Sequence, residues 1–258
     1  MILFHKNLST KKPNMVNKSY LNATKTIKSA FFKRCYLCGM RGTADELICK
    51  PCLKDLLAPM QTILCAHCKI PLGTESWHPH CAECRLTPPY YDACRAVSTF
   101  EFPASTLVHK LKYENKQFVA RLLGRLLAEE IAKSSPHSPD LVCPVPMHSD
   151  KRSTRSYNHA AEIGNYCARA LGLSCKPDLL IKTQTTASQS TLGRSERIKN
   201  LKNSLEVNKS INIKGQHIAV VDDVMTTGAT FDYAAKLLKA AGAKRVEVWT
   251  FARTPKPS

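Results

Sequence analysis

Two adjacent carboxylates, Asp222 and Asp223, directly follow a short apolar run at residues 218–221. The turn after them is rich in hydroxyl groups and reads Thr-Thr-Gly-x-Thr from Thr226 to Thr230. If a helix begins at this turn, its first amides lack internal partners and, with the threonine hydroxyls, offer an anion site. Carboxylates repel a bare phosphate, so the ligand should also carry hydroxyl groups or a metal ion. A sugar phosphate has that chemistry.

The elements that must position this segment are a strand before it and a helix after it. Residues 218–221 are too few for a helix and rich in β-branched side chains, which predicts a strand buried on both faces. We expect the carboxylate pair to end this strand and a helix to run to about Ala241. A Walker-type phosphate loop needs a lysine and a longer glycine loop. An ordinary helix cap after a core strand leaves the threonine spacing unexplained.

This segment resembles the phosphoribosyl pyrophosphate (PRPP) motif of type I phosphoribosyltransferases. In that motif the acidic pair takes the ribose 2′ and 3′ hydroxyls, and the following loop holds the 5′-phosphate. The resemblance implies that PRPP binds with Mg²⁺ at nine positions: Asp222, Asp223, Val224, Met225, Thr226, Thr227, Gly228, Ala229 and Thr230. Phosphoribosyl transfer expels pyrophosphate through a cation-like ribose, so the protein must position groups and stabilise charge. No residue is identified as the base for an acceptor.

Eight of the twelve cysteines form four C-x-x-C pairs. Each pair can aim two thiolates at one ion, and two pairs complete a tetrahedral Cys₄ zinc site. Pairing in sequence would give two zinc ribbons in tandem, whereas interleaved pairing would give one cross-braced module; we favour the first. The expected zinc ligands are Cys35, Cys38, Cys49, Cys52, Cys65, Cys68, Cys81 and Cys84.

The C-x-x-C pairs could also serve as redox dithiols or as ligands of an iron–sulfur cluster. A redox dithiol needs one C-x-x-C at a helix start in a βαβ unit, and iron–sulfur ligation suits the even pairing less well than zinc does. His67, His78 and His80 are nearby substitute ligands, although we expect them to be surface residues. The two zinc sites are closed, so we expect a structural role and a fold that depends on the metal. The four unpaired cysteines are expected to be buried.

Composition sets the class of protein. The 258 residues are 43% hydrophobic, enough for a core, and the net charge of +18 favours polyanions such as nucleic acid or phosphate-rich small molecules. Residues 1–34 hold eight Lys or Arg and no acid, which predicts a disordered basic tail; a transit peptide or a start at Met15 are alternatives. Apolar runs fall short of the roughly 20 residues of a membrane span. We expect a soluble, cytoplasmic protein with no transmembrane segment.

Strand and helix patterns alternate after residue 88. Strands are expected at 96–102, 141–145, 176–181, 218–221 and 245–251, and helices at 118–133, 157–171, 195–204 and after the acidic pair. Such alternation predicts an α/β fold with a parallel sheet flanked by helices and a ligand at the carboxyl ends of the strands. We therefore divide the chain into a tail (1–34), a double zinc-ribbon module (35–87) and a phosphoribosyltransferase-like domain (88–258).

Further motifs extend the resemblance over residues 35–253. They are H-x-L-K-Y at 109–113, P-V-P-M-H at 144–148 and Q-x-x-L-x-x-x-x-R-x-x-N at 189–200. With the cysteine pairs and the acidic pair, they resemble the ComF family of competence-associated phosphoribosyltransferase-like proteins. That family usually has R-G-F-N-Q where this chain reads Arg-Ser-Tyr-Asn-His at 155–159. The basic side chains expected to converge on the pyrophosphate are Lys112, Lys151, Arg152 and Arg155.

Two functions follow from these observations. The family resemblance implies a PRPP-binding protein that acts in DNA uptake during natural transformation, with single-stranded DNA and uptake proteins as partners. The alternative is an enzyme, either a pyrophosphohydrolase or a phosphoribosyltransferase in nucleotide metabolism or salvage with an unidentified acceptor base. The order Lys110, Lys112, Tyr113, Lys116, Phe118 comes closest to the basic and aromatic pattern that stacks bases.

Overall fold

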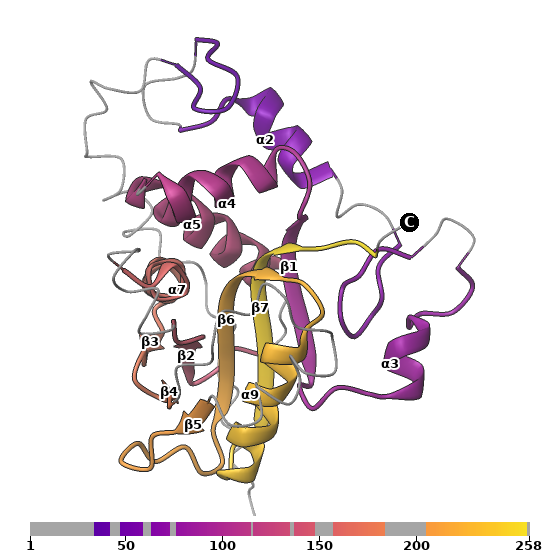
Figure 1. Cartoon of the computed structure of the whole chain (residues 1–258), viewed down its shortest axis with the longest axis vertical. Coiled ribbons are helices and arrows are strands. Elements are labelled where there is room, and N and C mark those ends of the chain that lie inside the picture. Colours follow the sequence, from indigo (N-terminus) through magenta and orange to yellow (C-terminus); the bar gives the residue numbers. More distant parts are fainter. Residues whose placement is uncertain are drawn as a thin grey trace, which may run out of the picture.

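A parallel five-stranded sheet forms the centre of the molecule (Figure 1). The computed structural model describes residues 34–41, 47–58, 63–72, 76–114, 116–134, 137–147, 157–183 and 205–256. The sheet has the order β1-β7-β6-β2-β3 and every neighbouring pair is parallel. Its strands are β1 (Ala93–Thr99), β2 (Leu141–Pro144), β3 (Ser174–Cys175), β6 (His217–Met225) and β7 (Arg245–Arg253). An antiparallel pair, β4 (Leu180–Lys182) and β5 (Leu205–Val207), stands apart from it.

Helices cover both faces of the sheet. One face is covered by α4 (Ala104–Tyr113), α5 (Gln117–Ser134) and α7 (His159–Leu171), and the other by α9 (Ala229–Ala240), which crosses in front of the sheet in Figure 1. Strand β6 shows why: Ala219 and Val221 join the core under α4, α5 and α7, whereas Ile218 and Val220 join the core under α9. Alternate residues of one strand thus fill two cores, and the predicted α/β layering is confirmed.

Strand β6 is longer than its sequence indicated. It continues through Asp222 and Asp223 to Met225, because β7 pairs with it as far as Arg253. The prediction that the carboxylate pair ends the strand was therefore wrong. The pair instead lies within hydrogen-bonded strand at the carboxyl edge, and α9 begins four residues after Met225.

The strands expected at 96–102, 141–145, 218–221 and 245–251 and the helices expected at 118–133, 157–171 and after the acidic pair are present with shifted ends. Three helices and the short strand β5 were not expected. Helix α4 was missed because its apolar positions span barely three turns, and α2 (Lys50–Leu57) and α3 (Ala82–Leu86) are shorter still. The expected strand at 176–181 is replaced by the short strands β3 and β4. The helix expected at 195–204 lies outside the described residues.

The cysteine-rich segment packs on the sheet domain at two separate places. Near α2, the Tyr36 ring meets the Phe118 ring at 5.0 Å between centroids, and Ser98 Oγ donates a hydrogen bond to the Leu56 carbonyl at 2.6 Å. The second half, around α3, contributes its cysteines to the core that also holds Met225 and Phe231. In Figure 1, α2 and α3 accordingly lie far apart. The boundary near residue 87 stays a prediction.

No helix in the described part of the chain combines the length and the apolar character needed to cross a membrane.

Candidate functional site

The acidic pair lies at the carboxyl edge of the sheet, as the expected ligand position requires. The Asp223 side chain is buried, and its main-chain amide donates a hydrogen bond to Asp222 Oδ1 at 2.8 Å. The Thr250 hydroxyl donates to the Asp223 carbonyl at 3.2 Å from the neighbouring strand. Both carboxylates are therefore fixed by β6 and its pairing with β7.

The surroundings of the Asp222 carboxyl make it harder to ionise than an ordinary aspartate. Burial raises the pKa of Asp222 to about 7, and the Asp223 charge acts in the same direction. The ammonium groups of Lys112 and Lys182 oppose that rise. A ligand that brings hydroxyl donors or a cation would favour the carboxylate form, because either one stabilises the negative charge.

Lys112 reaches the acidic pair directly. Its Nζ lies 2.8 Å from Asp223 Oδ1, and both side chains are largely shielded from solvent. Lys112 stands in the last turn of α4, whose buried Leu107, Val108 and Leu111 anchor the helix on the sheet. The structure thus brings together the one described basic residue of the predicted set and the predicted acidic pair.

The loop after β6 opens at the N-terminus of α9. Gly228 has a left-handed backbone (φ 83°), and a Cβ there would lie 2.6 Å from Met225 Cε, so only glycine fits without movement. Thr226 and Thr227 are exposed, and Ala229 and Thr230 are partly exposed. The Ala229 amide donates a hydrogen bond to Thr227 Oγ1 at 3.3 Å, so this hydroxyl caps the start of α9.

Two residues in this loop region have packing roles. The Met225 side chain is buried and accepts a hydrogen bond from Cys94 Sγ at 3.7 Å, so it packs in the core rather than facing a ligand. Val224 packs against the core on the α4 side.

Arg253 holds the main chain of the loop between β6 and α9 through hydrogen bonds. It was not identified from the sequence. Its side chain is buried at the end of β7, and Nη1 donates to the carbonyls of Met225 (2.9 Å), Thr226 and Thr254. Its Nε donates to the Cys68 carbonyl at 3.0 Å. Arg253 at the end of β7 and Lys182 on β4 belong to no motif with a characteristic spacing. The sequence alone therefore could not assign either residue to the site.

The remaining basic candidates, Lys151, Arg152 and Arg155, lie outside the described residues, as does the motif at 189–200. Asn158, which the family motif places next to them, caps α7: its Oδ1 accepts hydrogen bonds from the Ala160 and Ala161 amides. Its Nδ2 also donates to the Val145 carbonyl at 3.0 Å. The retained asparagine therefore fixes the start of α7 beside β2.

The eight paired cysteines form two clusters in sequence order. In each, the four sulfur atoms lie within 4.8 Å of one another: Cys35, Cys38, Cys49 and Cys52 in one, and Cys65, Cys68, Cys81 and Cys84 in the other. We name them the first and the second cysteine cluster. The sulfur atoms of Cys38 and Cys49 are 3.7 Å apart and those of Cys68 and Cys81 are 3.8 Å apart. A zinc tetrahedron with Zn–S bonds of about 2.3 Å requires about 3.8 Å, so tandem pairing is confirmed over cross-bracing.

The environment of the sulfur atoms also fits a metal. Main-chain amides of Cys49 and Cys81 donate to Cys35 Sγ (3.4 Å) and Cys65 Sγ (3.3 Å). Hydrogen bonds, led by that from Cys68, lower the pKa of Cys65 to about 3, whereas burial and the Cys65 charge raise that of Cys84 to about 12. Four thiolates this close repel one another unless a cation joins them. The residues present therefore fit zinc.

The neighbouring histidines lie outside the clusters, but they are partly buried rather than surface residues as expected. His67 Nε2 lies 2.8 Å from the Tyr91 carbonyl oxygen and His78 Nδ1 accepts from the His80 amide, so both rings are engaged outside the clusters. Three of the other four cysteines are fully buried and the fourth is partly buried: Cys94, Cys143, Cys167 and Cys175.

Comparison with known proteins agrees with the site. The family model described as phosphoribosyl transferase domain matches residues 160–257. The DNA utilization protein YhgH of Salmonella typhi is 32% identical over 227 residues, which cover 85% of this chain and 96% of that protein. Its Escherichia coli K12 counterpart is 31% identical over 225 residues, and the competence protein F of Haemophilus influenzae 30% over 226, both with the same coverage. Two cysteine clusters before a phosphoribosyltransferase-type sheet, and relatives matched over nearly their whole length, show that this chain belongs to the ComF family.

Proposed function

We propose that this protein binds PRPP together with Mg²⁺ at the carboxyl edge of the sheet. The observation that carries the proposal is the position of Lys112, 2.8 Å from Asp223 and beside the segment that joins the acidic pair to the N-terminus of α9. A cation, two carboxylates and the first turn of α9 therefore lie within one small region. This combination suits a ligand with a pyrophosphate, a diol and a second phosphate.

Each group has a distinct task in this proposal. Asp222 and Asp223 accept hydrogen bonds from the ribose 2′ and 3′ hydroxyls. The amides and hydroxyls from Thr226 to Thr230 hold the 5′-phosphate, aided by the dipole of α9.

The basic side chains face the leaving group. Lys112, whose ammonium group pairs with Asp223 in the structure, turns toward the pyrophosphate when ribose hydroxyls take over that carboxylate. We propose Lys151, Arg152 and Arg155 as further pyrophosphate ligands. The oxygen-rich donor set and the raised pKa of Asp222 fit a divalent cation, and Mg²⁺ would supply charge neutralisation of the pyrophosphate.

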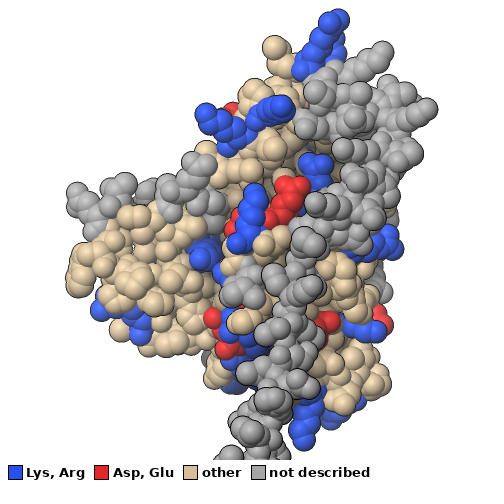
Figure 2. All heavy atoms as spheres, turned by 180° about the vertical axis from the view of Figure 1, so that it is seen from behind, with Lys and Arg blue, Asp and Glu red and all other residues tan. Residues whose placement is uncertain are grey.

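The biological role follows from the relatives' names. Because relatives are named for DNA utilization and for competence, we propose that the protein acts in the cytoplasm on single-stranded DNA, together with uptake proteins. On the face shown in Figure 2 the described Lys and Arg residues are dispersed rather than gathered into one patch.

A second candidate function is phosphoribosyl transfer to an acceptor base. The match to the phosphoribosyl transferase domain model favours it. Under this alternative the same site binds PRPP and an acceptor completes the reaction. Released pyrophosphate separates the two functions.

Calorimetry with PRPP and Mg²⁺ tests the proposal, using the wild type and an Asp222→Asn/Asp223→Asn variant. Asp140→Asn is the control, because the Asp140 carboxylate accepts a hydrogen bond from the His217 amide at the opposite edge of the sheet. We expect binding in the wild type and the control and none in the double variant; equal binding by all three contradicts the proposal. Pyrophosphate release once a base is added would favour the enzyme, and binding without release would favour the DNA-uptake role.

A further inference from the structure

The two cysteine clusters have the same four ligand atoms, but they differ in how far solvent reaches them. All four members of the second cluster are buried, and they lie in the core that also holds Met225. In the first cluster Cys38 is exposed and Cys49 and Cys52 are partly exposed, whereas Cys35 is buried. Access to solvent therefore distinguishes two sets of sulfur atoms that are otherwise alike.

Cys38 lies in an open turn. The next residue, Gly39, has a left-handed backbone (φ 70°), and a side chain added there would meet nothing within 4 Å beyond its chain neighbours. Met40 follows and is 68% exposed. At the corresponding turn of the second cluster, the Cys68 carbonyl accepts a hydrogen bond from the buried Arg253 side chain. The turn that carries Cys38 is therefore open to small solutes, and the turn that carries Cys68 is not.

Cys38 also has a second thiol within reach. Its Sγ lies 3.7 Å from that of Cys49, which belongs to the other C-x-x-C pair of the first cluster. The S–S bond of a disulfide is about 2.0 Å long, so an approach of about 2 Å joins the two sulfur atoms. Because zinc ligation requires thiolates, all eight sulfur atoms share that reactive form in the zinc-loaded protein. Oxidation of thiolates follows their exposure, which favours the first cluster.

We propose that the first cysteine cluster is a peroxide-sensitive site, in which Cys38 and Cys49 form a reversible disulfide. The Cys38 thiolate attacks one oxygen of hydrogen peroxide, the O–O bond breaks, and a sulfenic acid and a hydroxide ion result. The Cys49 thiolate then attacks the sulfenic sulfur, which forms the S–S bond and expels a second hydroxide. The two hydroxides take protons from solvent, so two thiolates are oxidised and the peroxide is reduced to two waters. A thiol reductant reverses the change.

This disulfide removes the means by which the first cluster holds zinc. Cys35 and Cys52 alone are too few ligands for a tetrahedral site. The Tyr36 ring, which contacts α5, directly follows Cys35, and α2 begins directly after Cys49. Loss of the metal therefore loosens both attachments of this half of the cysteine-rich segment to the sheet domain.

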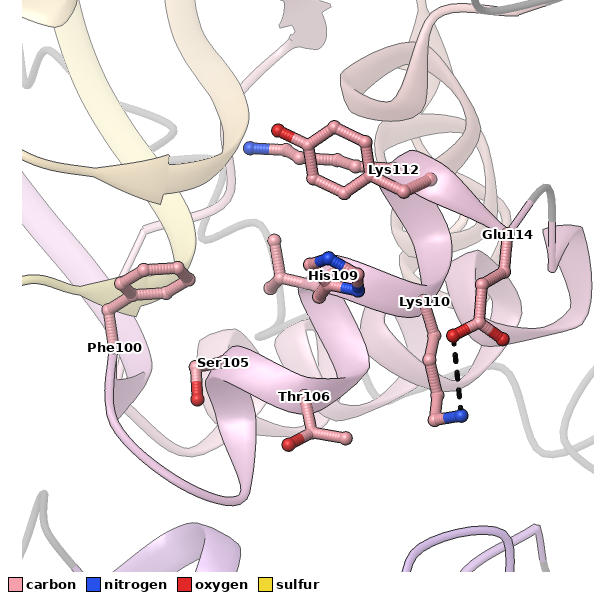
Figure 3. A pocket seen from close by; sticks show the side chains of 9 residues that line it. Phe100, Ser105, Thr106, His109, Lys110, Lys112 and Glu114 are labelled. Atoms are coloured by element: carbon pink, nitrogen blue, oxygen red, sulfur yellow. Dashed lines mark hydrogen bonds and ion pairs between the residues drawn. The ribbon is translucent and has the colours of Figure 1, made fainter.

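The attachment at Tyr36 is separate from the proposed phosphoribosyl site. The Lys110 ammonium lies 5.0 Å from the centre of the Tyr36 ring and also pairs with Glu114 at 3.5 Å. Figure 3 shows Lys110 and Lys112 pointing to different sides of α4. Lys112 instead contacts Asp223. The inference therefore does not rest on the proposed function.

The test treats the full-length, zinc-loaded protein with hydrogen peroxide and follows zinc release with a chromogenic chelator. Free thiols are then alkylated, and disulfide-linked peptides are identified by mass spectrometry. We expect one of the two zinc ions to be released about tenfold faster than the other or more, together with a Cys38–Cys49 disulfide. Reduction with dithiothreitol should restore zinc uptake.

Three variants assign the fast release to the first cluster. Cys49→Ser, which removes that cluster, should lose the fast phase, and Cys81→Ser, which removes the second cluster, should keep it. Met40→Leu is the matched control: it keeps both clusters, removes a neighbouring sulfur that peroxide also oxidises, and should release zinc as the wild type does.

The peptide map of the wild type decides the question even if a cysteine variant fails to fold. Release of both zinc ions at one rate would overturn the inference, as would a fast phase accompanied by a Cys68–Cys81 disulfide. A disulfide within the first cluster that excludes Cys38 would also overturn it. So would a first cluster that stays reduced and keeps its zinc after peroxide treatment.

Discussion

Arg253 donates a hydrogen bond from Nε to the main-chain carbonyl of Cys68, at 3.0 Å. The same buried guanidinium donates from Nη1 to the Met225 carbonyl at 2.9 Å. Cys68 belongs to the second cysteine cluster, and Met225 begins the loop before α9. One side chain therefore joins the second cysteine cluster to the proposed phosphate loop.

Replacing Arg253 should disturb both partners. Arg253→Lys keeps the charge but cannot donate in several fixed directions at once, so buried carbonyls lose their donors. We expect a loss of about 2–3 kcal/mol in the free energy of unfolding, from urea titrations, and weaker PRPP binding. Arg169→Lys on the exposed side of α7 is the control and should change neither quantity. Unaltered stability in Arg253→Lys would show that the guanidinium contacts contribute little.

Losing metal from the second cluster should loosen the phosphate loop, whereas losing it from the first should not. Elemental analysis should find two zinc ions per chain in the wild type. Each of the variants Cys49→Ser and Cys81→Ser should retain one zinc ion per chain. In hydrogen exchange, Cys81→Ser should speed exchange of residues 225–230, because Arg253 no longer has an ordered Cys68 carbonyl to bind. Cys49→Ser should instead speed exchange in α2 and around Tyr36, which contacts Phe118. Identical exchange patterns in the two variants contradict this division.

Gly228→Ala should cost ligand binding as well as stability. Its backbone is left-handed, and an added methyl group would lie 2.6 Å from Met225 Cε, so the Met225 side chain beneath the loop must move. Gly172→Ala is a matched control with φ of 70° and open space around it. Both variants should lose about 1 kcal/mol of stability from backbone strain, measured by urea unfolding. Only Gly228→Ala should also weaken PRPP binding; equal PRPP affinity in both variants would place the ligand elsewhere.

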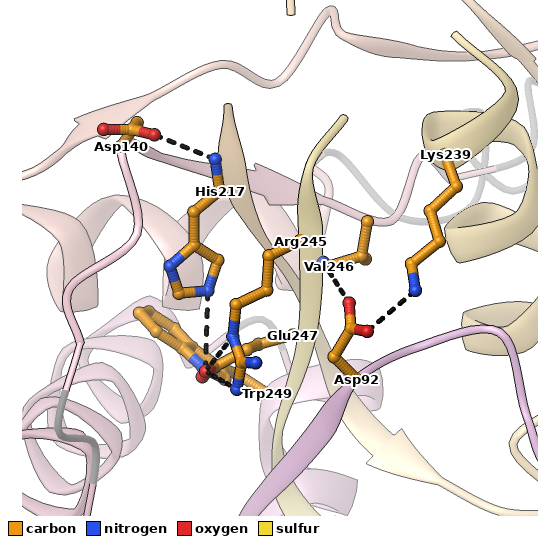
Figure 4. Close-up of polar contacts among 8 residues, drawn as sticks. All are labelled: Asp92, Asp140, His217, Lys239, Arg245, Val246, Glu247 and Trp249. Atoms are coloured by element: carbon orange, nitrogen blue, oxygen red, sulfur yellow. Dashed lines mark hydrogen bonds and ion pairs between the residues drawn. The ribbon is translucent and has the colours of Figure 1, made fainter. Parts of the chain in front are cut away.

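Glu247 should make the protein sensitive to acid at the other edge of the sheet (Figure 4). Burial alone raises its pKa, but hydrogen bonds from His217, Trp249 and Arg245 outweigh burial and lower the pKa to about 2. A lowered carboxylate pKa contributes stability above the unfolded value of about 4.5, which is lost as the pH falls toward 2.

Glu247→Gln tests that contribution. We expect it to cost about 3 kcal/mol at pH 7, and the difference from the wild type to shrink below about pH 4.5. Urea titrations at pH 7 and at pH 3.5 measure the two differences. Glu206→Gln, an exposed carboxylate on β5, is the control. A difference that stays constant between the two pH values contradicts an ionised Glu247.

Periodicity and spacing were sufficient for much of this architecture. The apolar stripe of α5 and the β-branched run of β6 predicted a helix and a buried strand, because each pattern matches one period. C-x-x-C spacing likewise predicted both cysteine clusters, since two thiolates on one turn converge on a single ion.

The residues that sequence could not supply act through tertiary contacts. The end of β6 is set by its pairing with Thr250 and Ala252, which overrides the turn preference of adjacent aspartates. Arg253 gains its position only when β1 and β7 lie side by side. It belongs to no local pattern, so only the assembled sheet reveals it.

The structure of the complex with PRPP and Mg²⁺ tests the central claim most directly. Our account predicts the ribose hydroxyls on the carboxylates of Asp222 and Asp223, the 5′-phosphate on the amides of residues 226–230, and the Lys112 ammonium moved from Asp223 toward the pyrophosphate. PRPP bound away from the carboxyl end of β6, or a Lys112–Asp223 contact unchanged at 2.8 Å with the ligand present, would contradict it.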